Sequence, residues 1–369
     1  MNKQKIISLI ERYRILLYFF HHQPSIGLMP KGVPCQVEDP EADITHGDVV
    51  HPCVRYIEEG FEGHQWWMVY TPFYGGDDHM ENPRLCYADS DNNTPPTKWK
   101  HYCIVKGQPQ TGYNSDPTLL YHKGELYVFW RECHTETTDN IGCNYATFGC
   151  VVRNRVPKPL PKALLPNVIG EVKRSHDREI SPTFWVVGNK LKAFALHQKF
   201  DPDFVSCLPT KLARILYRYS LFFLSDALGL YNKIQNRGVA IWEGESFNSQ
   251  FQYSETVKIK NVSRLYQPWH MDLFQKEEDE KTLYAIVQTS EYFADICLAS
   301  CDDNRHFRLF RKPLLTSRTI GMSGLYKSTA LIVGDDLHLY YTALDNQDPK
   351  LNKLFVTTTN WNALLYSIQ

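Results

Sequence analysis

A short apolar strand, a tight turn and a second strand rich in aromatic residues recur five times along the chain. In the clearest copy, residues 115–130, Gly124 marks the turn between the two strands. The five copies begin near residues 51, 116, 181, 270 and 328. A degenerate repeat of hairpins is the sequence signature of a β-propeller, in which each copy forms one blade. The chain is therefore predicted to be an all-β protein, a five-bladed β-propeller.

The repeats are longer than plain blades. Their starts lie roughly 60 to 90 residues apart, whereas a four-stranded blade needs about 40–50 residues, so loops must be added between strands. The longest addition, residues 201–237, contains an apolar helical pattern at 211–224 and is predicted to be a helical insertion in the third blade. The basic, proline-rich stretch 153–162 is predicted to be a solvated loop.

Residues 1–43 precede the first repeat and are predicted to form a leader, with the propeller spanning 44–369. Apolar residues at helical spacing within 6–20 predict an amphipathic helix, with an irregular segment as the alternative. The fifth copy ends at the C-terminus, so an early strand from this leader would suit closure of the ring. The apolar run at 15–20 is shorter than a signal-peptide core or the ~20 residues of a membrane span. Localisation is left open.

Composition narrows the classes of function. With 40 Lys+Arg against 41 Asp+Glu, the net charge of −1 gives no electrostatic reason to expect a nucleic-acid partner. The 10 cysteines are scattered through predicted strands, which indicates reduced, buried thiols and a reducing compartment. Phosphate-binding loops, dinucleotide fingerprints and nucleophile elbows are not found in a convincing context.

Ionisable residues precede the inner strand of every repeat. The inner strands of a propeller begin at one end of its central channel, so these residues are expected to converge there. The leading residues are Asp48 in the first copy, Asn114 and Asp116 in the second, Glu179 in the third, Trp269, His270 and Asp272 in the fourth, and Arg318 and Lys327 in the fifth. Burying such groups is costly unless they are paired or used, so the ring predicts a polar site. For each motif taken singly, the alternative is the turn chemistry of a proline at the start of a strand.

The arrangement resembles the five-bladed propeller glycosidases of glycoside hydrolase family 43 and its arabinanase, xylosidase and invertase-like relatives. The resemblance rests on Asp48 in the first copy, the Asn-Ser-Asp-Pro run ending at Pro117, the Glu-Ile-Ser-Pro run beginning at Glu179, and the Trp-His-Met-Asp run ending at Asp272. It covers roughly residues 44–369. Residues 66–72 (Trp-Trp-Met-Val-Tyr-Thr-Pro), with the Glu-Asn-Pro run at 81–83, are also similar to family-43-like domains of bacterial and phage polysaccharide-active proteins.

The resemblance implies an inverting glycoside hydrolase acting on a poly- or oligosaccharide. Carried over to this chain, Asp48 is the general base, Asp116 adjusts the pKa and orientation of the acid, and Glu179 is the general acid. Inversion needs two carboxyl groups about 6.5–9.5 Å apart with a water molecule between. No cofactor is required, although His270 matches a channel histidine that could bind Ca²⁺ or another cation. Glu179 stands three residues before Pro182, one more than in the family pattern.

Further residues are predicted to bind the sugar, through stacking by aromatic rings or hydrogen bonds by polar groups. These are Trp67, Tyr113, Asn114, Arg131, Glu132, Trp269, His270, Asp272, Arg318 and Lys327. The alternative for the aromatic residues in this set is that they belong to the hydrophobic core of the blades. Two other functions stay open, a non-catalytic carbohydrate-binding propeller and an interaction scaffold. Oligomeric state cannot be predicted.

Overall fold

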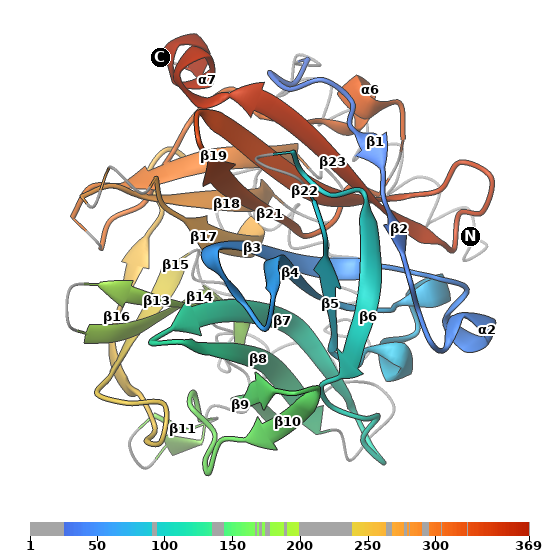
Figure 1. Cartoon of the computed structure of the whole chain (residues 1–369). Coiled ribbons are helices and arrows are strands. Elements are labelled where there is room, and N and C mark those ends of the chain that lie inside the picture. Colours follow the sequence, from blue (N-terminus) through green and yellow to red (C-terminus); the bar gives the residue numbers. More distant parts are fainter. Residues whose placement is uncertain are drawn as a thin grey trace, which may run out of the picture.

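Five β-sheets surround a central channel in the computed structural model, which confirms the predicted all-β, five-bladed β-propeller (Figure 1). The structure describes residues 26–368 except 91–93, 135–143, 167, 170–171, 174–177, 188–189, 199–237, 263–267, 277–278, 280, 290–294, 304 and 323. The helical pattern predicted within 6–20 and the helical insertion 201–237 lie outside the described residues.

Each blade contains consecutive antiparallel strands that follow one another outward from the channel, and blades 1 and 5 each add an early strand, β2 or β1, at the outer edge. Blade 1 contains β3 (Val50–Phe61), β4 (His64–Thr71), β5 (Arg84–Ala88) and β6 (Lys98–Ile104), with β2 (Gln36–Val37) added parallel to β6. Blade 2 contains β7 (Tyr113–His122), β8 (Glu125–His134), β9 (Asn144–Arg153) and β10 (Val156–Pro159). Blade 3 contains β13 (Arg178–Val187), β14 (Lys190–Gln198), β15 (Gly238–Gly244) and β16 (Gln252–Lys258).

The last two blades complete the ring. Blade 4 contains β17 (Pro268–Phe274), β18 (Leu283–Thr289), β19 (Asp295–Cys301) and β20 (Arg308–Leu309). Blade 5 contains β21 (Ser328–Val333), β22 (Asp336–Leu344), β23 (Asn352–Asn360) and β1 (Val33–Pro34). The inner strands β3, β7, β13, β17 and β21 each contact the next, and β21 contacts β3.

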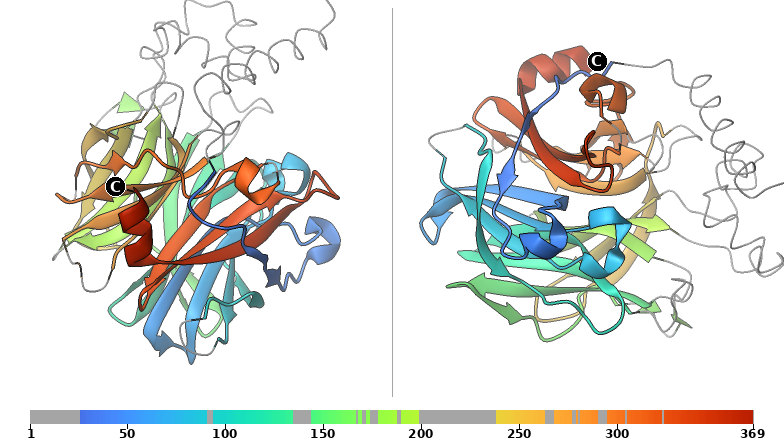
Figure 2. Two further views of the ribbon diagram at one scale, coloured as in Figure 1. Left: turned by 90° about the horizontal axis from the view of Figure 1, so that it is seen from above. Right: turned by 90° about the vertical axis from the view of Figure 1, so that its right-hand side faces the viewer.

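Short elements occupy the connections. They are β11 (Val168–Ile169) and β12 (Val172–Lys173), α2 (Ala42–Thr45), α6 (Ser317–Ile320), α7 (Trp361–Ile368), η1 (Tyr74–Gly76) and η2 (Asp78–Met80). Helix α7 lies on the outside of the propeller beside β23 (Figure 2). Among the described residues, no helix is both long and apolar enough to cross a membrane.

Strands from distant parts of the sequence close blade 5. Val33 of β1 pairs antiparallel with Val356 of β23 at the outer edge of this blade (Figure 1). Gly32 lies so close that a Cβ atom there would be 2.3 Å from the Val356 carbonyl oxygen. Only glycine fits at this close approach of two backbones.

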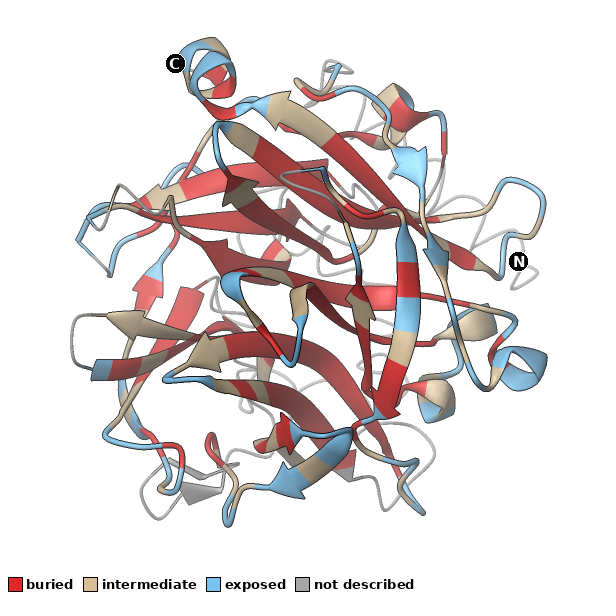
Figure 3. Cartoon of the chain, in the orientation of Figure 1, coloured by how far each residue is buried: buried red, intermediate tan, exposed pale blue. Residues whose placement is uncertain are grey.

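A separate hydrophobic cluster fills each gap between neighbouring blades, because the faces of each sheet are apolar. The cluster between blades 1 and 5 contains Trp66 and Tyr340, and that between blades 2 and 3 contains Phe129 and Phe184. Buried positions follow the inner and middle strands, whereas exposed ones gather on the outer strands (Figure 3). The stretch 153–162, expected to be a loop, instead contains β10, which pairs with β9 as the outer strand of blade 2.

A β-bulge interrupts the inner strand at the same place in three consecutive blades. His51, Asp116 and Ser181 have positive φ angles of 54°, 51° and 51°, and each is followed by a proline. The strand register shifts at each of these residues. Left-handed backbone at a non-glycine residue costs roughly 1–2 kcal/mol, and bulges of this kind re-aim side chains at functional sites. The three residues are therefore structural equivalents at the channel.

Candidate active site

A largely buried ion pair joins two inner strands. Arg55 of β3 and Asp272 of β17 form a bidentate contact, with Nη2 2.9 Å from Oδ1 and Nη1 3.0 Å from Oδ2. Arg55 Nε also donates to the carbonyl of Leu119, and the Thr329 hydroxyl donates to Asp272. Asp272, predicted to bind sugar, thus holds three inner strands together with Arg55 and Thr329.

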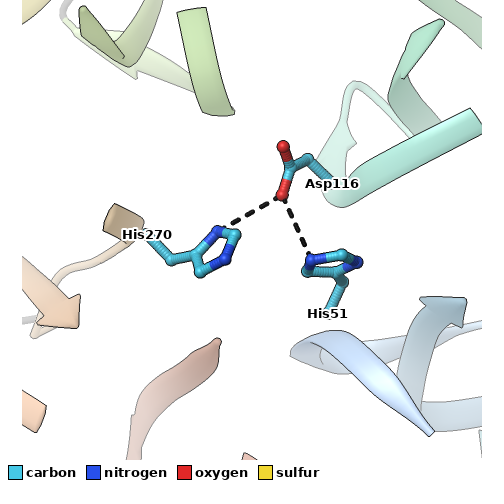
Figure 4. Close-up of side chains that lie close together, drawn as sticks. All are labelled: His51, Asp116 and His270. Carbon is cyan, nitrogen blue, oxygen red and sulfur yellow. Dashed lines mark ion pairs between the residues drawn. The ribbon is translucent and has the colours of Figure 1, made fainter. Parts of the chain in front are cut away.

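Near the start of the inner strands, one carboxylate and two imidazole rings, each from a different blade, lie close together (Figure 4). Asp116 Oδ1 lies 3.5 Å from His51 Nε2 and 3.3 Å from His270 Nδ1. All three side chains are buried, and we call them the His–Asp–His cluster. Burial lowers the pKa of His51 well below its usual range and that of His270 to about 4. Both rings are therefore neutral at pH 7.

Cationic side chains flank Asp116. Arg131 Nε lies 3.2 Å from Asp116 Oδ2, and Lys327 Nζ donates to the Pro117 carbonyl at 3.2 Å. Burial alone would raise the pKa of Asp116, but the Arg131 charge and the hydrogen bond with His270 outweigh it and hold that pKa well below its usual range. Asp116 is therefore ionised. The structure brings together three residues that the sequence predicted for the site, Asp116, Arg131 and His270, with Lys327 beside them.

A pocket opens next to this cluster, at the seam between blades 1 and 5. The Tyr326 ring contacts His51 and His270, with centroids 5.1 and 4.7 Å away. The same ring lies parallel to Phe73 at 6.4 Å, and both rings line the pocket, whose volume is about 310 Å³. Glycines 75, 76 and 324 and residues Leu325, Leu344, Pro349, Lys350 and Asn352 complete the lining.

Asp48 accepts hydrogen bonds from two residues that line this pocket. Its Oδ1 accepts a hydrogen bond from the Phe73 amide at 2.7 Å, and its Oδ2 accepts from the amide and the side chain of Asn352 at 2.6 and 2.9 Å. Phe73 and Asn352 both line the pocket. Burial raises the pKa of Asp48 to about 6 despite these donors. The role of general base stays a prediction for this fully buried carboxyl group.

The raised pKa of Asp48 predicts a distinct pH dependence of stability. The folded protein keeps the Asp48 proton up to about pH 6, whereas the unfolded chain loses it near pH 3.8. Between these values the unfolded chain binds fewer protons, so stability falls as pH rises, by about 3 kcal/mol in total. Chemical denaturation from pH 3.5 to 8 measures the free energy of unfolding of wild type and of Asp48→Asn. The wild-type value minus the variant value should decline up to about pH 6. A difference that stays constant would contradict the raised pKa.

Glu179 lies on β13 two residues before the bulge at Ser181. Its Oε1 is 3.3 Å from His197 Nδ1 on the neighbouring strand β14, and the two residues pair in the strand register. The structural equivalent of Glu179 in blade 2 is Asn114, two residues before Asp116. The role of Glu179 as general acid stays a prediction.

The other residues predicted to bind sugar are distributed more widely. Trp67 is completely buried in the cluster between blades 1 and 2. Tyr113 packs against Cys133 and Tyr145, and Asn114 donates to the Gly107 carbonyl. Glu132 accepts from the indole of Trp130, Trp269 packs partly buried against the cluster between blades 3 and 4, and Arg318 is exposed on α6.

Two residues at the site were not predicted as functional. His51 is the blade 1 equivalent of Asp116, and the shared pattern of a polar residue before proline was its signal. Glu81, just after η2, is buried with Oε1 3.7 Å from His51 Nδ1. Burial raises the pKa of Glu81 well above its usual range. Glu81 lies in a connection outside the strand repeat; the Glu-Asn-Pro run at 81–83 is part of the family resemblance, but no role is predicted from it.

No family model and no curated protein sequence matches the chain. Among solved structures, an N-acetylgalactosamine deacetylase from F. plautii in complex with blood group B trisaccharide is 14% identical, with 93% of this chain and 97% of that chain covered and a TM-score of 0.56. A GH43 enzyme from Xanthomonas citri complexed with xylose is 10% identical, with 90% of each chain covered and a TM-score of 0.53. The same identity and coverage, with a TM-score of 0.54, hold for Zg3597, a family 117 glycoside hydrolase from Zobellia galactanivorans.

These likenesses show the fold. The chain has the five-bladed β-propeller fold of family 43 and family 117 glycoside hydrolases, as its sequence resemblance implied.

Proposed function

We propose that the protein is a glycoside hydrolase that acts on an oligo- or polysaccharide at the end of the channel where the inner strands begin. The observation that carries this proposal is the position of Asp116, a buried carboxylate that side chains from blades 1, 2, 3 and 4 contact beside an aromatic pocket. The fold shared with glycoside hydrolases supports the same class of substrate.

The pocket beside the cluster suits a sugar ring. Its parallel walls, Phe73 and Tyr326, offer aromatic faces to the apolar face of a pyranose. A volume of about 310 Å³ is at the small end of ligand sites, which favours the recognition of one or two sugar units over a long segment of polymer.

We propose that Glu179 donates the proton in an inverting reaction and that Asp116 orients it. General acid catalysis contributes about 10²–10⁴-fold to such a reaction. Glu179→Gln is therefore expected to lower kcat by that factor on a glycoside that wild type cleaves, found by screening 4-nitrophenyl glycosides of pentoses and hexoses. Glu243→Gln, a change of a surface carboxylate paired with Lys190 and Lys192 in the same blade, is the matched control and should keep full activity.

Unchanged kcat in Glu179→Gln would remove this residue from the reaction. The stereochemistry of the product, read by NMR within the first turnovers, tests inversion separately. A β-configured substrate should give the α-anomer first, and retention would contradict the proposed mechanism.

The arrangement around Asp48 favours a second candidate, a non-catalytic carbohydrate-binding propeller. Both Asp48 oxygens accept hydrogen bonds from nitrogen donors of Phe73 and Asn352, and the side chain is fully buried. A carboxylate held in this way has no access to a water molecule at a sugar. Binding on a glycan array, together with no product from any bound glycan, would decide for this alternative.

A further inference from the structure

We infer that the His–Asp–His cluster binds one divalent transition-metal ion, such as Zn²⁺ or Mn²⁺. His51, Asp116 and His270 each offer one ligand atom, and these atoms lie within 4.8 Å of one another. The side chains come from three blades and point into one common space (Figure 4). This inference does not depend on the proposed glycosidase reaction.

The distances fit a shared ion. Metal–ligand bonds of about 2.0–2.2 Å place two ligands of a tetrahedral site roughly 3.3–3.6 Å apart. His51 Nε2 lies 3.5 Å from Asp116 Oδ1, which matches such an edge. His270 Nδ1 contacts the Ser181 hydroxyl at 2.7 Å, while His270 Nε2 is buried with no hydrogen-bond partner among the described residues. We assign Nε2 as the third ligand atom, because a buried ring nitrogen without a partner is costly.

Each ligand has an outer partner that fixes its orientation, as metal-binding histidines and carboxylates usually do. His51 Nδ1 is 3.0 Å from the Thr71 hydroxyl and 3.7 Å from Glu81 Oε1, so its Nε2 is left for the ion. Asp116 Oδ2 contacts Arg131 Nε, which leaves Oδ1 on the side of the histidines.

The donor set selects the kind of ion. Ca²⁺ takes 6–8 oxygen ligands, whereas two imidazole nitrogens and one carboxylate oxygen suit Zn²⁺, Mn²⁺ or Co²⁺. The positive charges of Arg131 and Lys327 oppose binding, although Arg131 is already paired with Asp116. We therefore expect one ion per chain, bound more weakly than at a structural zinc site.

Metal content and affinity test the inference without any substrate. Full-length protein is stripped with a chelator and titrated with ZnCl₂, MnCl₂ or CaCl₂ in a calorimeter. Wild type should bind one equivalent of Zn²⁺ or Mn²⁺ at least tenfold more tightly than His270→Gln, and Ca²⁺ should not compete. His338→Gln is the matched control, because His338 is equally buried and contacts the Thr358 hydroxyl through Nδ1, but lies on β22; its affinity should equal that of wild type.

A second variant covers the case in which His270→Gln does not fold. Ser181→Ala keeps all three ligands but removes the hydroxyl at His270 Nδ1, and should lower affinity about 10–100-fold. Visible absorption of the Co²⁺-loaded protein gives an independent signal of nitrogen ligation. Binding of Ca²⁺ as tight as that of Zn²⁺, or affinity within twofold of wild type in the folded cluster variants, would overturn the inference. Because no glycoside is present, neither outcome is confused with failure of the proposed reaction.

Discussion

Asparagine in place of Asp116 should lower the free energy of unfolding by about 3–5 kcal/mol, because removing one member of a buried ion pair leaves the other charge unpaired. That charge is Arg131, whose guanidinium is buried and lies 3.2 Å from the carboxylate. The same variant should lose hydrolytic activity by about 10²–10⁴-fold, because the carboxylate is the centre of the proposed site. Urea denaturation measures the first effect, and kcat on the glycoside found by screening measures the second.

A second substitution separates these effects. Asp116→Asn combined with Arg131→Met removes both charges and should recover most of the stability, because an apolar side chain replaces the buried guanidinium. Activity should stay lost in the double variant. Asp335→Asn, at an exposed turn, is the control for the chemical change and should match wild type. An Asp116→Asn protein with wild-type activity and less than about 1 kcal/mol of destabilisation would contradict the central role given to this residue.

The second large effect is expected at the ion pair between Arg55 and Asp272. Asp272→Asn should lower the free energy of unfolding by about 3–5 kcal/mol, because Arg55 would remain buried without its bidentate partner. Arg55→Met should cost a similar amount, since it leaves the Asp272 carboxylate uncompensated. Equilibrium denaturation in urea at pH 7 measures both changes.

The double variant Arg55→Met with Asp272→Leu gives the sharper test. Replacing a whole buried ion pair by apolar side chains is often neutral or stabilising, so the double variant should be more stable than either single variant. The coupling between the two sites should then be several kcal/mol in a double-mutant cycle. Additive losses from the two substitutions would show that the pair does not couple the inner strands as the geometry indicates.

The propeller was predictable because its repeat follows from local rules. Apolar strands joined by tight turns, most of which contain a glycine such as Gly124, recur in the sequence, and the blade count follows from the copies. The stretch 153–162 shows where this reasoning ends. Prolines favour a loop, but Pro157 and Pro159 lie on an outer strand, where only one edge of the backbone needs partners.

The site was predictable only in part. Asp116, His270 and Lys327 were identified because the inner strands bring their leading residues to one end of the channel, whereas Arg131 lies on β8, the second strand of blade 2, where it pairs with Ser115. A polar residue before proline is common to His51, Asp116 and Ser181 in the sequence, but only the structure shows that each stands at a β-bulge, which makes His51 rather than Asp48 the equivalent of Asp116. Glu81 reaches the cluster from a connection whose path depends on tertiary packing.

The sequence also did not show which aromatic residues line the pocket. Trp67 was taken as a sugar platform, yet it is wholly buried with Phe61 and Tyr102 around it. Phe73 and Tyr326, which do line the pocket, were not predicted, although Tyr326 stands next to Lys327 before the inner strand of the fifth copy. Composition favours aromatic residues in strands, and only the assembled blades decide which rings face a ligand.

The hydrogen bonds between Asp48 and Asn352 join residues that are 304 positions apart in the chain. A ribosome must therefore add Asn352 before the seam between blades 1 and 5, and with it the pocket, can exist. Blades 2 to 4 can form from earlier and more local contacts, whereas contacts between such distant residues form slowly. The pocket should thus be the last part of the molecule to appear during synthesis, and any saccharide binding there should require that the ring has closed.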